Sequence, residues 1–289
     1  MAPHAAWRCF RYLIVEIAFC ACVQGQVHFR LEPRALIERR LKSFNSDNQS
    51  REDLIHTWFA RSGCAKRNLS EQPAKAGLPP NVICVLPGET DEVIVVGAHT
   101  DKVMSAGDGV VDNWTGASLL PSLLFSLSAE KRHHIFVFVG FSAEEEGMIG
   151  SAYYVNHLTP EQRGHVQAMV NMDSLGLGPT KVWASHADRV LLDALTLVAA
   201  RSKLPVSTGN VDNLGTSDSE SFARYHIPRV TLHSVTQENM RVLHSPNDKL
   251  ATIKVADYYD SYHLIVEYLA YLDDVLKPAP AATPDKAAH

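Results

Sequence analysis

The stretch HIFVFVGFSAEEEG, residues 134–147, decides the fold class. Its first part, residues 134–139, is a continuous apolar run, which is typical of a strand buried on both faces of a sheet. Three carboxylates, Glu144 to Glu146, follow directly after that strand. Their charges repel one another, and partial burial would raise their pKa values, so a purely structural role explains them poorly. A divalent cation at this strand end would remove the conflict.

Strand-like and helix-like segments alternate on both sides of this stretch, which predicts an α/β fold. We expect a single domain with a mixed, mostly parallel central sheet flanked by helices. Ser50 and Asp53 resemble a capping box that opens one of the helices. The runs at 81–86 and 92–96 are predicted to pair as a β-hairpin. The other predicted strands are 166–172 and 228–232, and the predicted helices are 30–46, 50–61, 114–127, 147–158, 186–202 and 255–276.

The two ends of the chain differ in composition from the middle. Two arginines, an apolar stretch at 12–23 and small residues near Gly25 predict a signal peptide over residues 1–25, although Glu16 interrupts the stretch and a buried helix is the alternative. Residues 278–289 are rich in Pro and Ala, which predicts a disordered tail. We therefore expect one domain over residues 27–277 in a secreted or periplasmic protein.

Charge and cysteine content restrict the possible functions. A formal net charge of -5 gives no basic field for nucleic acid, and no segment other than the N-terminal one approaches a membrane span. Outside the predicted signal peptide the chain keeps Cys64 and Cys84, which form either one disulfide or two buried thiols. Two cysteines are too few for a Cys-rich zinc site, so any metal must bind His and carboxylates.

Four more groups of polar residues lie at strand ends or in loops, and they contain His99, Asp112, Asp173 and His244. In His99-Thr-Asp101 the two outer residues point the same way in an extended segment, so Asp101 can accept a hydrogen bond from a metal-bound His99. Each group has an ordinary alternative: a surface His beside an Asp, a helix N-cap for Asp112, or a loop His for His244. Taken together, two His and three carboxylates suit two zinc ions. The five predicted metal ligands are His99, Asp112, Glu145, Asp173 and His244.

The order of these motifs resembles the co-catalytic dizinc aminopeptidases of peptidase family twenty-eight, over roughly residues 80–270. The motifs are HTD at 99–101, DNWTGAS at 112–118, AEEEGMIGS at 143–151, NMDS at 171–174 and HSPND at 244–248. The resemblance implies a zinc-dependent aminopeptidase that acts on peptides through a metal-bound hydroxide. We therefore expect two zinc ions in a zinc peptidase domain.

The resemblance also implies a role for each residue. Glu144 matches the general base, and Asp101 matches the carboxylate behind the metal-binding His99. His99 and Asp173 would hold one zinc and Glu145 and His244 the other, while Asp112 would bridge the two.

The chain departs from the family at two places. Some members carry a Tyr that donates to the oxyanion where this chain has Leu243, and His233 and Tyr225 are replacement candidates. Some members also have a His directly after the Ser-Asp pair, where this chain has Ser219. Asp218 could support the metal site or hold a substrate amine, but a helix N-cap by Ser217 or Asp218 is the favoured interpretation.

Three other functions remain open at this point. A carboxypeptidase or dipeptidase could use the same metals, and a glutaminyl-cyclase-like enzyme shares the fold but uses a single zinc. A non-catalytic binding module would be expected to have lost ligands or the base, and His99, Glu144 and His244 are all present. Oligomeric state and side-chain preference are not predicted.

Overall fold

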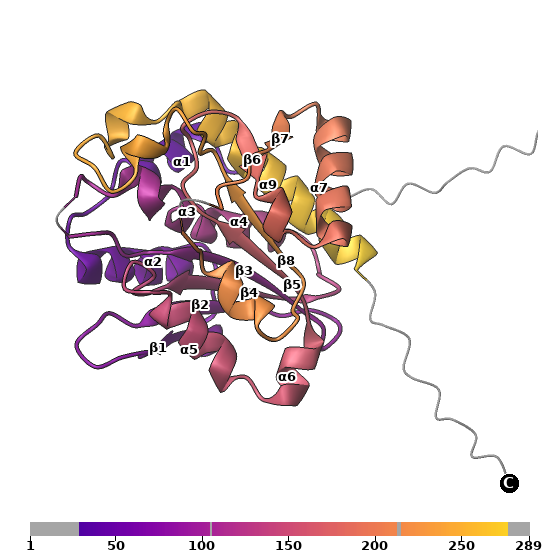
Figure 1. Cartoon of the computed structure of the whole chain (residues 1–289). Helices are drawn as coiled ribbons and strands as arrows, with labels where there is room; N and C mark the ends of the chain where they lie inside the picture. The colour runs from indigo at the N-terminus through magenta and orange to yellow at the C-terminus, as the bar shows by residue number, and fades with distance from the viewer. Residues whose placement is uncertain (1–28, 105, 213–214, 277–289) are drawn as a thin grey trace, which may run out of the picture.

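The computed structural model describes residues 29–276, apart from residue 105 and residues 213–214. The predicted signal peptide and the predicted C-terminal tail lie outside these residues. Figure 1 shows one central sheet with helices packed on both sides of it. No helix within the described residues is long and apolar enough to cross a membrane.

The sheet has eight strands in the described part of the chain, in the order β1-β2-β4-β3-β5-β8-β6-β7. The four middle strands β4, β3, β5 and β8 run parallel, while β1, β2 and the β6–β8 pair add antiparallel contacts at the two sides. This confirms the predicted mixed, mostly parallel sheet. The strands are β1 (Leu69–Gln72), β2 (Asn81–Leu86), β3 (Val93–His99), β4 (Ile135–Phe141), β5 (Val166–Met172), β6 (Thr180–Val182), β7 (Val206–Thr208) and β8 (Arg229–His233).

Helices cover both faces of this sheet, so its middle strands are buried on each side. Along β3, Ile94 and Val96 belong to one apolar cluster with α1, α2, α4, α7 and α9, while Val95 faces a smaller cluster that includes residues of α5 and α8. Burial on both faces explains why β3 and β4 are almost entirely apolar. The helices are α1 (Arg34–Leu41), α2 (Asn48–Arg61), α3 (Thr115–Ala117), α4 (Leu120–Leu127), α5 (Ile149–His157), α6 (Pro160–His165), α7 (Arg189–Ser202), α8 (Ser219–Ala223) and α9 (Val255–Val275).

The predicted β-hairpin of residues 81–86 and 92–96 is wrong. β4 lies between β2 and β3, antiparallel to the first and parallel to the second. The loop after β2 does not turn back, because its amides at Glu89 and Thr90 donate to the carbonyls of Arg132 and His133, just before β4. The loop therefore passes around the start of β4, and β3 enters the sheet on the far side.

The start of α2 also differs from its prediction. The side chain of Asp47, not Ser50, caps this helix by accepting a hydrogen bond from the Ser50 amide at 2.8 Å. The predicted helix of residues 114–127 is broken into a wide turn at 110–114 followed by α3 and α4. Of the two alternatives for the cysteines, the structure has the disulfide: Cys64 and Cys84 are bonded, with their Cα atoms 6.1 Å apart.

The parallel middle strands end at the same edge of the sheet. β3 ends at His99, β4 is followed by the turn that carries Glu144 and Glu145, and β5 is followed by Asp173. In open α/β sheets this edge is where ligands bind. Residues far apart in the sequence are therefore brought together at one place.

Candidate metal centre

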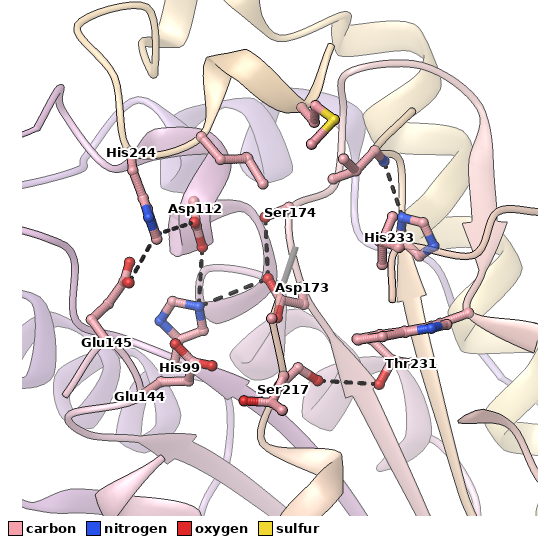
Figure 2. A pocket seen from close by; sticks show the side chains of 17 residues that line it. His99, Asp112, Glu144, Glu145, Asp173, Ser174, Ser217, Thr231, His233 and His244 are labelled. Atoms are coloured by element: carbon pink, nitrogen blue, oxygen red, sulfur yellow. Dashed lines mark hydrogen bonds and ion pairs between the residues drawn. The ribbon is translucent and has the colours of Figure 1, made fainter. Parts of the chain in front are cut away.

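The five predicted ligands meet at this edge of the sheet (Figure 2). His99 Nε2 lies 3.2 Å from Asp112 Oδ1 and 3.8 Å from Asp173 Oδ1. On the other side, His244 Nε2 lies 3.2 Å from Asp112 Oδ2 and 2.9 Å from Glu145 Oε2. Asp112 therefore faces one histidine with each of its two oxygens, which is the arrangement that a bridging carboxylate requires.

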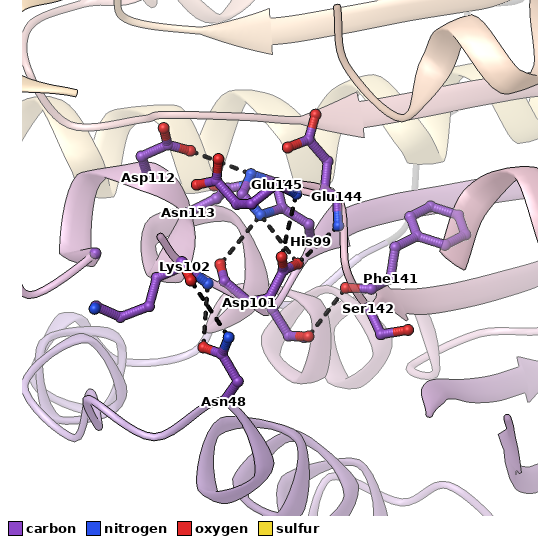
Figure 3. A network of polar contacts seen from close by, with 12 residues as sticks. Asn48, His99, Asp101, Lys102, Asp112, Asn113, Phe141, Ser142, Glu144 and Glu145 are labelled. Carbon is purple, nitrogen blue, oxygen red and sulfur yellow. Dashed lines mark hydrogen bonds and ion pairs between the residues drawn. The ribbon is translucent and has the colours of Figure 1, made fainter. Parts of the chain in front are cut away.

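The carboxylate of Asp101 organises the turn after β4 (Figure 3). Its two oxygens accept hydrogen bonds from the amides of Glu144 and Glu145, at 3.0 and 3.2 Å. Its Oδ1 also lies 3.6 Å from His99 Nδ1, and its backbone oxygen lies 3.2 Å from the same nitrogen. Asp101 thus lies behind His99, and it also fixes the backbone of two acidic residues, which sequence analysis missed. Its role beside a metal-bound His99 stays a prediction.

Two further side chains position the loop that carries Asp112. Asn113 donates to the carbonyl of Met172 at 2.8 Å and accepts from the Ser174 amide at 3.2 Å, so it ties this loop to the end of β5. Asp248 accepts from the amides of Val111 and Asp112 at 2.6 and 3.1 Å. The motif HSPND therefore contributes its last residue as well as its first.

Electrostatics within this cluster are extreme when no metal is bound. Burial lowers the pKa of His99, but the charge of Glu144 and contacts with neighbouring aspartates raise it overall, well above its ordinary value. Hydrogen bonds with Asp112 and Glu145 raise the pKa of His244 to about 10. Protons on both imidazoles thus offset the negative charge of the surrounding carboxylates.

The donor set fits divalent metal ions. Two groups, His99–Asp112–Asp173 and Asp112–Glu145–His244, each bring three ligand atoms within 4.8 Å of one another. Atoms that share one zinc at about 2 Å are at most about 4 Å apart, so these positions are close to those of a coordinated ion. In addition, Glu145 Oε1 is buried and has no hydrogen-bond partner among the described residues, as expected of an atom kept for a cation.

The metal cluster forms one wall of a cavity of about 200 Å³. The apolar part of the lining comes from the segments that follow β6, β7 and β8. Its apolar lining residues are Trp183, Val211, Val235, Met240 and Leu243. A ligand in this cavity would therefore contact both the acidic residues that can bind metal and the apolar residues.

The sequence model of peptidase family M28 matches residues 81–269. This chain belongs to peptidase family M28. The matched segment includes all five predicted ligands and both Asp101 and Glu144, so the family resemblance is confirmed.

Three comparisons show which other proteins this M28 chain resembles. A curated aminopeptidase of Pseudomonas aeruginosa is 34% identical over 89 residues, a match that covers 31% of this chain and 16% of that protein. A zinc aminopeptidase from Bacillus subtilis has a similar fold, with a TM-score of 0.60 at 21% identity over 66% of this chain and 49% of the other. The glutaminyl cyclase of Porphyromonas gingivalis gives 0.65 at 17% identity, over 82% of this chain and 96% of the other. The two structural likenesses are evidence for the fold alone.

Neither candidate for the oxyanion donor can serve in this M28 site. The Nδ1 atom of His233 accepts from the Val235 amide at 3.1 Å, so its Nε2–H must donate to the Gly209 carbonyl at 2.8 Å. Burial lowers the pKa of His233 to about 4, so the ring is neutral and has no free N–H. Tyr225 does not line the metal cavity, and its hydroxyl donates to Asn156 at 2.6 Å.

The interpretation of Asp218 as a helix cap is also wrong. It precedes α8, but its side chain makes no capping hydrogen bond. Asp218 is fully buried, and neither carboxylate oxygen makes a hydrogen bond of normal geometry within the described chain. Burial raises its pKa to about 7, although the charge of His99 and the nearby Ser151 hydroxyl lower it. A Ser-Asp pair before a short helix is typical of an ordinary cap, so no sequence pattern predicts that both Asp218 oxygens lack a hydrogen-bond partner among the described residues.

Proposed function

We propose that this chain is a zinc-dependent aminopeptidase that hydrolyses the N-terminal residue from peptides and holds two zinc ions. One observation carries the proposal: the groups His99–Asp112–Asp173 and Asp112–Glu145–His244 share Asp112. A shared carboxylate between two sets of nitrogen and oxygen ligands suits a paired zinc centre. The aminopeptidases with similar sequence and fold support the same chemistry.

In this proposal the zinc ions supply Lewis acidity, both to water and to the scissile carbonyl. Glu144 takes a proton from the attacking water and later gives it to the amine of the leaving peptide. Burial raises the pKa of Glu144 well above its ordinary value; the charge of His99 opposes this, and those of Asp218, Asp173 and Asp112 add to it. Such an environment favours a carboxyl that holds a proton between the two steps.

The charge of the cavity favours the amino end of a peptide over its carboxyl end. Its lining residues include Asp112, Glu144, Glu145 and Asp173, and none of the described lining residues is Lys or Arg. An ammonium group is attracted to such a surface, whereas a carboxypeptidase needs a cation beside the metals to hold a carboxylate. We therefore prefer an aminopeptidase to a carboxypeptidase.

A glutaminyl-cyclase-like activity is the second candidate, because the fold matches nearly the whole length of such an enzyme. The two candidates differ in metal content and in substrate. A cyclase of this type is expected to hold one zinc and to release ammonia from N-terminal glutamine. The retention of both His99 and His244 at opposite oxygens of Asp112 favours two metals.

The test of the function is a panel of aminoacyl p-nitroanilides and their N-acetylated forms, assayed with and without a chelator. We expect release of p-nitroaniline from the free-amine substrates alone, loss of activity with the chelator, and two zinc ions per chain by elemental analysis. Equal cleavage of the acetylated substrates would overturn the aminopeptidase assignment. One zinc per chain with ammonia release from glutaminyl peptides would establish the cyclase instead.

The role of Glu144 is tested separately with Glu144→Gln. We expect turnover to fall by at least a factor of about 100, a typical contribution of general acid–base catalysis, while both zinc ions stay bound. Glu146→Gln is the matched control, because this neighbouring side chain is half exposed and faces Lys75 instead of the cavity. Turnover of Glu144→Gln equal to that of the control would rule out the proposed base.

We also propose that the mature protein acts outside the cytoplasm, as a catalytic domain over residues 27–277. The predicted signal peptide and the Cys64–Cys84 disulfide both support an oxidising compartment.

A further inference from the structure

A second cavity, of about 460 Å³, adjoins the metal cavity. The two cavities share three lining residues: Val211, Val235 and Met240. The two cavities therefore adjoin at these three side chains, and together, here called the groove, they reach from the metal ligands to residues of β6 and β7.

Lys181, on β6, is the one charged residue among the described residues that line the second cavity. Its Nζ donates to the Ser207 hydroxyl at 3.1 Å, and the structure shows no ion pair between Lys181 and a described carboxylate. The pKa of Glu238, an exposed acid, is lowered mainly by a hydrogen bond from Thr236 and to a smaller extent by the charge of Lys181. Lys181 thus keeps a positive charge that is available to a ligand.

One residue, His233, lies close to both ends of the groove. Lys181 lies opposite His233 in the antiparallel pairing of β6 with β8, and His233 lines the metal cavity. Both flank Gly209: a Cβ atom at that glycine would lie 2.8 Å from Lys181 Cδ and 3.3 Å from His233 Cε1. The pKa of His233 is lowered mainly by burial; the charge of Asp173 raises it and the charge of Lys181 lowers it. His233 is therefore near both a metal ligand and the lysine.

The charges at the two ends of this groove are complementary to those of a short peptide. Its metal end is lined by carboxylates and its other end carries a cation, so a peptide fits with its ammonium near the metals and its carboxylate toward β6. We propose that Lys181 binds the C-terminal carboxylate of short peptides, which makes this enzyme selective for short peptides with a free C-terminus. This inference rests on the proposed aminopeptidase function and adds to it a substrate class and a specificity residue.

The test uses leucyl peptides of two, three and four residues, each as the free acid and as the C-terminal amide. For the length that fits the groove, we expect the wild type to favour the acid over the amide about tenfold in kcat/KM, through KM. In Lys181→Met the acid-to-amide ratio falls to about one, and in Lys181→Glu the amide is preferred. Taking the ratio within each variant cancels any general loss of activity.

Two controls separate the possible explanations. Lys131→Met removes an exposed lysine that lines neither cavity, and it should leave the ratio unchanged. Peptide amides with Asp in place of the last residue test a side-chain carboxylate: if these, and not the free acids, respond to Lys181, the C-terminal assignment is wrong.

The failure of this inference is distinguishable from that of the proposed function. If the wild type does not cleave aminoacyl p-nitroanilides, the aminopeptidase proposal fails. If it cleaves them and the acid-to-amide ratio at every length is the same in wild type and Lys181→Met, only the role of Lys181 is refuted.

Discussion

Replacing Asp218 by Asn should stabilise the metal-free protein, and the gain should grow with pH. Asp218 is fully buried, and neither of its oxygens makes a hydrogen bond of normal geometry in the described chain. Its charge is therefore poorly compensated when the metals are absent. Asn has nearly the same shape as a protonated Asp and carries no charge, so the variant should behave as the wild type does at low pH.

The magnitude follows from the pKa. Burial raises the pKa of Asp218 to about 7, against an ordinary value of 3.8. Because the folded state binds this proton more tightly than the unfolded state, protonation favours folding. That stabilisation is fully present below pH 3.8 and is lost as the pH rises toward 7. At about 1.4 kcal/mol per pKa unit, the wild type loses about 4 kcal/mol over this range, and the variant does not.

The assay is urea unfolding of chelator-treated wild type and Asp218→Asn at a series of pH values from about 4 to 8. The free energies of unfolding should nearly coincide at the acid end and diverge steadily until about pH 7, with the variant more stable. Asp91→Asn, at an exposed loop position, is the control and should run parallel to the wild type at every pH. A difference between Asp218→Asn and wild type that does not change with pH would refute the reasoning.

Two more predictions concern parts of the structure that support the site. Asp248→Ala leaves the buried amides of Val111 and Asp112 without their acceptor, so it should lower the free energy of unfolding by about 2–4 kcal/mol and weaken zinc binding. Thermal unfolding and chelator competition measure these two effects. A melting temperature equal to that of the wild type would contradict the prediction. The Cys64→Ser/Cys84→Ser variant loses a cross-link that spans 20 residues, which should lower the free energy of unfolding in urea by about 3 kcal/mol. Reductant should then shift the midpoint of the wild type but not that of the variant, and an unchanged wild-type midpoint would show that the bond is not stabilising.

The centre of the fold could be predicted because its signals are local. Strand β4 is a continuous apolar run and β5 is mostly apolar, and acidic residues follow each strand within three positions, so both the strands and the candidate site at their ends are visible in the sequence. The short strands β1, β6 and β7, of three or four residues, were missed because they have too few residues for an apolar pattern. The position of β3 was also missed, because it depends on contacts between residues 89–90 and 132–133.

The supporting residues could not be predicted for a similar reason. Asp248 accepts from the amides of Asp112 and Val111, which are 136 and 137 positions away, and no local sequence pattern predicts such a contact. His233 failed as an oxyanion donor because two backbone groups, at Gly209 and Val235, already use both of its ring nitrogens. Residue type and the family motifs together predicted the ligands, whereas the free or occupied state of each donor depends on the tertiary structure.

The contacts of Asp248 have a consequence for protein engineering. Its carboxylate binds the loop before α3, its backbone oxygen accepts from the Asp108 amide at 2.8 Å, and a side chain at Gly107 would collide with the carbonyl of Ser245. The loops at 107–112 and 244–248 are therefore one interlocking unit, although more than 130 residues separate them in the sequence. A graft from a related enzyme that exchanges one loop should fail, and the pair must be transplanted together.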